Sequence, residues 1–311
     1  MPLQDEHEAA LARLVASGQL TAAQAQAVRQ EFEGVLSKPA KAGWLVEAAA
    51  YAGGALMLAG AALFLGTQWE TLSDSFKVVL LLGISAVFIA AAFFLTADQG
   101  IRKAVGARGR AAGALLALAA IPAAFAAEVP SPAGNDGQWA MTAGLVVSLA
   151  ALALRSSALG IVIGAFFTGG AAFTLLNDFG ERHVLPTALV LLAAGALWTA
   201  AGFLGWLRPK PLALVAGGVL AITGAQYPLA DGRLDVLAYV LTLAVSAICF
   251  ALFRWSRSMV MLVGGVAGLT LAVPEWVYDL TNGGLSPAVI LLIAGIVLLT
   301  GSAFGMQLRK R

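Results

Sequence analysis

Ten long apolar segments, separated by short polar loops, limit what this chain can fold into. Crossing a bilayer core about 30 Å thick takes about 20 apolar residues of α-helix, and most of the segments have that length. Charged residues make up 12% of the chain, whereas a soluble domain carries about 25%. We therefore expect an all-α, polytopic transmembrane bundle over residues 44–311. The predicted spans are 44–66, 76–95, 111–127, 139–154, 157–176, 184–207, 212–230, 236–253, 259–273 and 287–306.

Two places in this pattern of spans are irregular. Pro122 in the third segment has no backbone N–H, so we expect a kink there, with a neighbouring helix satisfying the freed carbonyl. Residues 155–157 make a very short turn between the fourth and fifth segments. An alternative count of spans therefore merges 139–176 into one re-entrant or tilted unit.

Basic residues lie almost entirely on one side of the predicted spans. Fourteen Lys and Arg residues flank that side, against Lys77, Arg182 and Arg233 on the other. Because cytoplasmic loops are enriched in Lys and Arg, we expect both termini in the cytoplasm. Residues 1–43 lack the apolar stretch of a signal peptide, so we expect them to stay in the compartment of synthesis. The fourteen are Lys38, Lys41, Arg102, Lys103, Arg108, Arg110, Arg155, Arg208, Lys210, Arg254, Arg257, Arg309, Lys310 and Arg311.

The five loops on the opposite side each carry two carboxylates. Glycine pairs lie in four of the helices that lead into these loops. Together, the acid pairs and the glycine pairs indicate a quasi-repeat of helical hairpins about 50 residues long. The alternative is that short translocated loops are simply polar. Acids spaced i,i+4 share a face if their loop is helical. The acids either attract cations to a vestibule or are solvated. The pairs are Glu70/Asp74, Glu128/Asp136, Asp178/Glu181, Asp231/Asp235 and Glu275/Asp279.

A polar tail, residues 1–43, precedes the first span. Residues 5–16 read as a helix that stops at Ser17 and Gly18, and Thr21 with Gln24 has the spacing of a capping box for a second helix. A hairpin over residues 5–36 is too short to bury an adequate core alone. It must therefore pack on the bundle, on another copy of itself, or on a protein partner.

The tail also carries a family resemblance. The pattern Leu-x2-Leu-x3-Gly-x-Leu-Thr-x2-Gln runs from Leu11 to Gln24, and Thr67-Gln68-Trp69-Glu70 follows the first, Gly-rich span. Over about residues 8–95 the chain resembles the bacterial membrane family known as domain of unknown function 2157. That family usually has Asn before the Trp-Glu pair, where this chain has Gln68. The resemblance implies a polytopic bacterial inner-membrane protein and no particular activity.

Glu47 is the one ionisable residue well inside a predicted span, apart from Lys77 at the mouth of the second. Tyr51 lies one helical turn further along the same face. Burying a carboxylate in a bilayer is costly, which makes Glu47 a candidate for binding a proton or a substrate. Glu47 is also only about 5 Å beyond Trp44 along the helix, close enough to be an interfacial anchor.

Three further candidates lie near the outer ends of the spans. Trp69 and Glu70 stand at the mouth of the first hairpin, and Glu275-Trp276 mirrors this pair at the last one. Gln226, near the end of the seventh span, is placed to line a cavity. Each also has an ordinary structural role, because Trp anchors membrane interfaces and a buried amide hydrogen-bonds a neighbour.

The sequence lacks the motifs of several membrane enzymes and pumps. No histidine lies in a predicted span, there is no His-Glu-x-x-His or Gly-x4-Gly-Lys motif, and no run of intramembrane acids forms a proton relay. Because the net charge is only +2, we expect no nucleic-acid partner. Because these motifs are missing, we also expect no catalytic residue, metal or cofactor. The favoured function is a carrier for a small amphipathic or uncharged solute. The alternatives are a non-enzymatic scaffold or sensor that docks a partner through the tail hairpin and, ranked last, a lipid-handling enzyme.

The substitution Glu47→Gln separates the two interpretations of this carboxylate. If Glu47 binds a proton or a substrate, the variant is expressed normally but its transport activity in cells is impaired, because the amide cannot ionise. Full activity in the variant would show that the carboxylate is an anchor.

Overall fold

The computed structural model shows an all-helical chain that divides into two compact units, Met1–Leu72 and Ser73–Arg311, described here one at a time. Among the residues that it describes, seven helices are long and apolar enough to cross a membrane, in agreement with a multi-pass membrane protein. The described residues are 11, 13–28, 56, 63, 66–67, 69–98, 100–104, 106–131, 137–177, 184–281, 284 and 286–310.

The described part of the first unit contains the helix stop and the capping box predicted for the tail. Helical residues at 13–16 end where Gly18 takes φ +73°, a conformation that glycine adopts readily past a helix. Helical residues at 22–28 follow, and Thr21 and Gln24 exchange two backbone-to-side-chain hydrogen bonds of 3.0 and 3.3 Å. None of the described residues from 11 to 28 is buried, as expected of a hairpin too small to have its own core.

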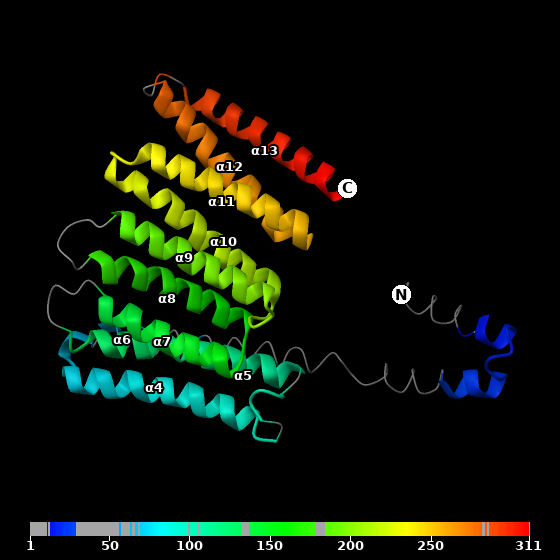
Figure 1. The fold of residues 1–311 in the computed structure, drawn as a ribbon. Helices are drawn as coiled ribbons and strands as arrows, with labels where there is room; N and C mark the ends of the chain where they lie inside the picture. The colour runs from blue at the N-terminus through cyan, green and yellow to red at the C-terminus, as the bar shows by residue number, and fades with distance from the viewer. Residues whose placement is uncertain are drawn as a thin grey trace. The chain divides into compact units, whose positions relative to one another are not determined.

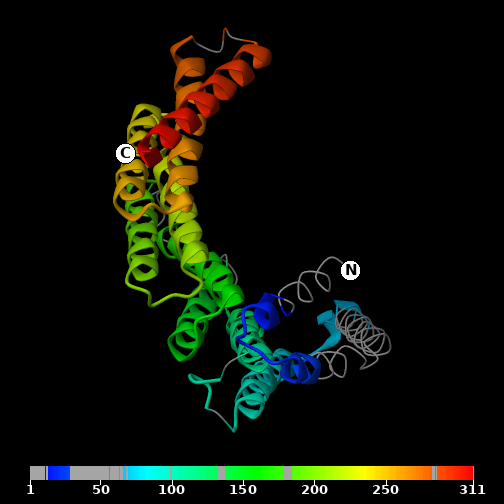
Figure 2. The same cartoon turned by 90° about the vertical axis from the view of Figure 1, so that its right-hand side faces the viewer.

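The second unit is a succession of helices that lie side by side in chain order (Figure 1). In both views its first and last helices lie at opposite ends (Figure 2). Nine of the ten predicted spans coincide with these helices, and the first, 44–66, lies mostly outside the described residues. The elements are α4 (Asp74–Leu95), α5 (Gly106–Leu118), α6 (Ala120–Glu128), α7 (Gln138–Leu154), α8 (Ala158–Asn177), α9 (Val184–Phe203), α10 (Lys210–Gln226), η2 (Tyr227–Asp231), α11 (Asp235–Ser256), α12 (Met259–Leu280) and α13 (Pro287–Lys310).

Two of these helices are short for a bilayer. α7 and the apolar part of α13, Ala288–Gly301, fall below the length of the other candidate spans. The number of crossings therefore stays a prediction.

The third predicted span is broken between α5 and α6, as expected from its proline. Pro122 cannot donate to the carbonyl of Leu118, and α5 ends at that residue. The hydroxyl of Ser85 on α4 donates a 2.8 Å hydrogen bond to the carbonyl of Ala119, between the two helices. A neighbouring helix thus supplies a donor next to the break, but to the carbonyl of Ala119, which also accepts from the backbone N–H of Ala123, and not to the carbonyl of Leu118 that the proline frees.

Side chains from the turn at 155–157 tie the loops of the basic side together. The guanidinium of Arg155 donates to the carbonyls of Ile101 and Ala104, both at 2.7 Å. The hydroxyl of Ser156 donates to the carbonyl of Arg208 at 2.9 Å and accepts from its backbone N–H at 2.6 Å. These bonds satisfy loop backbone groups that the helices leave unpaired, and they link the turn at 155–157 to two other basic loops.

The ninth predicted span is longer than the sequence indicated. α12 continues through Pro274 and includes Glu275 and Asp279, which we had expected in a loop. A proline is tolerated inside a membrane helix when neighbouring groups satisfy the freed backbone carbonyl. Separately, the carboxylates of Glu275 and Asp279 accept hydrogen bonds from adjacent helices. The helical i,i+4 arrangement expected of the acid pairs therefore holds for this pair.

The most extensive helix contacts are those of α9 with α10 and of α11 with α12. Both pairs are joined on the basic side, whereas α8–α9 and α10–α11, the hairpins expected around acidic loops, pack less extensively. The α9–α10 contact brings the two backbones together, because a Cβ on Gly195 would lie 2.6 Å from the backbone nitrogen of Ala221. Small residues allow such close packing of helices in lipid.

Two adjacent glycines of α10 test this contact. A Cβ at Gly217 would lie 2.8 Å from the carbonyl oxygen of Gly195, whereas a Cβ at Gly218 would meet no atom within 4 Å. We expect Gly217→Ala to destabilise the protein by about 1–3 kcal/mol through overpacking. The matched control, Gly218→Ala, should be neutral or stabilising by up to about 1 kcal/mol, since Ala favours helix. Thermal unfolding in detergent measures both, and equal melting temperatures would contradict the close contact.

Candidate functional site

The structure places three of the five sequence-predicted candidates. Glu47 and Tyr51 lie outside the described residues. Trp69 and Glu70 lie in a short 3-10 helix, η1 (Trp69–Thr71), in the first unit, with Glu70 exposed. Gln226 is the last residue of α10, and it alone of the three is brought together with a polar cluster.

That cluster, here called the outer cluster, joins the ends of α10, α11 and α12. It consists of Gln226, Tyr239, Glu275, Trp276 and Asp279. The amide nitrogen of Gln226 donates to the Glu275 carboxylate at 3.0 Å, and the Tyr239 hydroxyl donates to the Asp279 carboxylate. The ring of Tyr239 also stacks on Trp276, with centroids 6.4 Å apart.

The outer cluster is a structural tie between helices. Its two carboxylates are spaced i,i+4 on α12 and each accepts from a different neighbouring helix, which fixes α10 and α11 against α12. Among the described residues, no group of three His, Cys, Asp or Glu side chains is placed to bind a metal. The amide nitrogen of Gln226 thus has a partner, whereas its buried side-chain oxygen has none among the described residues.

Other acids of the outer loops also have local partners. Asp74 forms a 3.1 Å ion pair with Lys77. The carboxylate of Glu128 accepts from the backbone N–H groups of Gly137 and Ala140, at 3.2 and 3.0 Å, and so caps the N-terminus of α7. Glu128 thus supports a helix end, while the side chain of Asp74 is also 73% exposed to solvent.

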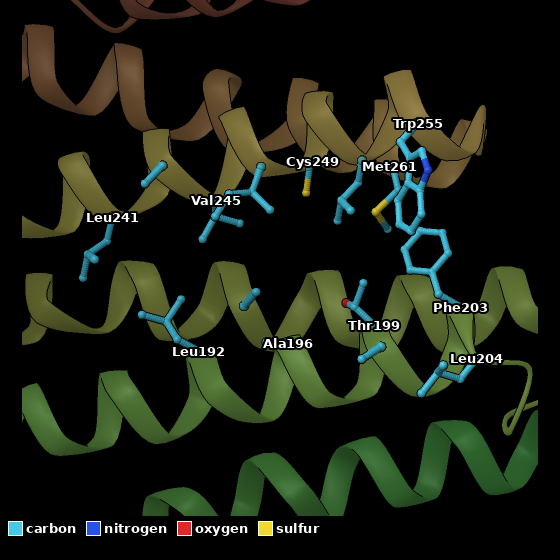
Figure 3. Close-up of a pocket in the computed structure, with 15 residues that line it drawn as sticks. Leu192, Ala196, Thr199, Phe203, Leu204, Leu241, Val245, Cys249, Trp255 and Met261 are labelled. Atoms are coloured by element: carbon cyan, nitrogen blue, oxygen red, sulfur yellow. The ribbon is translucent and has the colours of Figure 1, made fainter.

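An apolar groove of about 660 Å³ lies between α9 and α11 and is here called the α9–α11 groove (Figure 3). Ala221 of α10 and Met261 of α12 contribute to its lining. None of the lining residues is charged, and Thr199 carries the only hydroxyl. The volume is within the range of small-molecule sites. The lining residues are Leu192, Ala196, Thr199, Ala200, Phe203, Leu204, Ala221, Leu241, Ala244, Val245, Ile248, Cys249, Leu252, Trp255 and Met261.

The groove results from how the helices are layered. α10 contacts both α8 and α12 directly, while the facing sides of α9 and α11 carry Ala196, Ala200 and Ala244. Side chains this short cannot fill the space between two helices that are both packed on α10. Two smaller apolar grooves, of about 480 and 400 Å³, lie between α8 and α10 and between α10 and α12.

Two aromatic rings flank the end of the groove nearest the basic loops. Phe203 of α9 and Trp255 of α11 face each other there, with ring centroids 6.2 Å apart (Figure 3). The ammonium of Lys210 lies over the Phe203 ring, 4.7 Å from its centroid. A cation stacked on an aromatic face is stabilised by the ring quadrupole, so a positive charge is held at this mouth.

Sequence reasoning missed Tyr239 and every residue of the groove. The apolar lining resembles any membrane-facing helix surface, and its small residues are spread over three helices, so no local signal marks it. Tyr239 carried a weak signal, because it is the one tyrosine in the interior of the α11 segment, and it is almost fully buried.

Comparisons with protein-family models, with curated proteins and with solved structures find no match to this chain. The resemblance to the domain of unknown function 2157 family therefore stays a prediction. Functional argument must come from the groove and from the charges around it.

The tie between Tyr239 and Asp279 can be measured by a double-mutant cycle. We expect Tyr239→Phe and Asp279→Ala each to lower the melting temperature in detergent and to be non-additive, with a coupling of about 1 kcal/mol, since each removes the same hydrogen bond. Tyr278→Phe, on the neighbouring exposed residue, should leave stability unchanged. Strictly additive effects would show that the bond contributes nothing.

Proposed function

We propose that this chain is a non-enzymatic, multi-pass protein of the bacterial inner membrane that binds and carries a small amphipathic or uncharged molecule in the α9–α11 groove. The observation that supports it is the groove itself, a site-sized space whose lining residues are all uncharged. An apolar wall gives a charged solute no compensation for its lost hydration, whereas it favours a hydrocarbon portion through burial. The site thus selects for apolar or amphipathic molecules.

The proposed orientation has the C-terminus and the basic loops in the cytoplasm. From α7 to α12, successive α-helices run in alternating directions, so the loops with Arg155, Arg208 and Arg257 lie at one end of the helices and the outer cluster lies at the other (Figure 1). The bias of Lys and Arg towards the cytoplasm supports this orientation. A membrane-impermeant thiol reagent should label Asp231→Cys in intact cells and Lys103→Cys after lysis. The reverse pattern would refute the orientation.

Filling the groove tests the proposed function. Ala196→Trp combined with Ala244→Trp places two large rings in the space between α9 and α11. We expect this variant to lose binding of a fluorescent lysophospholipid in detergent and to lose protein-dependent movement of that lipid between leaflets of proteoliposomes. Leakage of an impermeant quencher is monitored in parallel.

The matched control is Leu197→Trp combined with Val240→Trp, on exposed faces of the same two helices that do not line the groove. It should bind and move the lipid as the wild type does. If the filled variant also binds like the wild type, the groove is not the site. If the wild type binds but moves no lipid, the carrier is refuted and a binding role remains.

A scaffold or sensor is the second candidate. It is favoured by the tail hairpin, whose described residues include no buried side chain and leave Leu14 37% exposed. Such a hairpin gains stability when a second copy or a partner covers its exposed apolar side chains. Deleting residues 5–36 should abolish self-association of the purified chain while leaving lipid binding intact, and unchanged association would argue against this role.

A further inference from the structure

We propose that the basic mouth of the α9–α11 groove binds the headgroup of an anionic phospholipid whose acyl chain lies in the groove. This inference rests on the proposed function, because it names the class of molecule that the groove accepts. It adds a polar half to a site that is otherwise apolar.

The charge around the two ends of the groove sets the direction of such a lipid. Arg208 lies in the loop before α10, and Lys210 is the first residue of that helix. Exposed Arg254 directly precedes the groove residue Trp255 in the sequence of α11. At the other end, Leu241 lies about 9 Å along α11 from Asp235, near the outer cluster with its two carboxylates. An anionic headgroup is therefore attracted to the first end and repelled from the second.

One cation of the mouth, Lys210, and the loop that precedes it are held in place before a ligand binds. Both backbone groups of Arg208 are hydrogen-bonded to the Ser156 hydroxyl, at 2.6 and 2.9 Å, which anchors the loop that leads into α10. Lys210 stacks on Phe203, 4.7 Å from the ring centroid. A preorganised positive site loses less conformational entropy on binding a phosphate than mobile side chains would.

The aromatic pair at the mouth argues against a zwitterionic choline lipid. Phe203 and Trp255 form the kind of aromatic surface that can bind a quaternary ammonium. The Phe203 face already carries the Lys210 ammonium, and a second cation there would be repelled. Trp255, 80% exposed, instead stands where an indole ring favours the level of the headgroups. The mouth accordingly favours a headgroup with net negative charge.

Native mass spectrometry of the detergent-purified full chain tests this site. The protein is titrated with phosphatidylglycerol or with phosphatidylcholine carrying the same acyl chains. We expect wild type to bind phosphatidylglycerol more tightly, and Lys210→Gln with Arg254→Gln to weaken that binding about fivefold for each cation removed. Binding of phosphatidylcholine should not change.

Two control variants keep the test falsifiable. Lys210→Arg with Arg254→Lys retains both charges and should retain the preference. Arg102→Gln with Lys103→Gln removes two exposed cations from another basic loop and should have no effect. Equal affinity of wild type for the two lipids, or an equal loss in the Arg102/Lys103 variant, would overturn the proposal.

The groove-filled variant, Ala196→Trp with Ala244→Trp, separates this inference from the proposed function. If wild type binds the two lipids equally and the groove-filled variant binds neither, the groove remains a binding site and the anionic headgroup site is refuted. Unchanged binding of both lipids on filling would refute the two together. Loss of a clear phosphatidylglycerol preference on filling supports both.

Discussion

The close contact between the backbones of α9 and α10 is the constraint on which the second unit depends. In lipid no hydrophobic force drives helices together, so their association relies on close packing and hydrogen bonds. Gly195, Gly217 and Gly224 leave room for this contact, since a Cβ at any of them would lie within 3 Å of backbone atoms on the facing helix. Once α9 is held on α10, and α12 contacts α10 as well, the short alanines facing across α9 and α11 leave the groove open.

The polar residues of this unit are used chiefly at the ends of helices. On the basic side, Arg155 and Ser156 satisfy loop carbonyls and amides. On the acidic side, Glu128 caps α7 and the carboxylates of α12 accept from Gln226 and Tyr239. An unsatisfied backbone or side-chain group is costly near a bilayer. Most of these charged side chains therefore satisfy groups at the ends of helices. The ammonium of Lys210, over the ring of the groove residue Phe203, is the charge whose position favours a ligand.

The span pattern could be predicted because helix length and apolar content are local properties. Nine of the predicted segments coincide with helices, and Pro122 marked the break between α5 and α6 correctly. The end of α12 was placed wrongly, because Pro274 and two acids read as a loop. Whether such a stretch stays helical depends on donors from α10 and α11, more than 30 residues away in the chain, and no local pattern records them. The same limitation hid Tyr239, while Gln226 was found as a candidate without its partner.

By itself, the sequence determined the class of the protein and the sides on which its charges lie, since hydropathy and the positions of Lys and Arg are written along the chain. It also indicated that small residues mediate packing, but not which ones. The tertiary structure decided that Gly217 is in contact while Gly218 faces open space, and that α9 and α11 enclose a groove. Both outcomes depend on which faces of the helices meet, which is set by contacts among several helices at once.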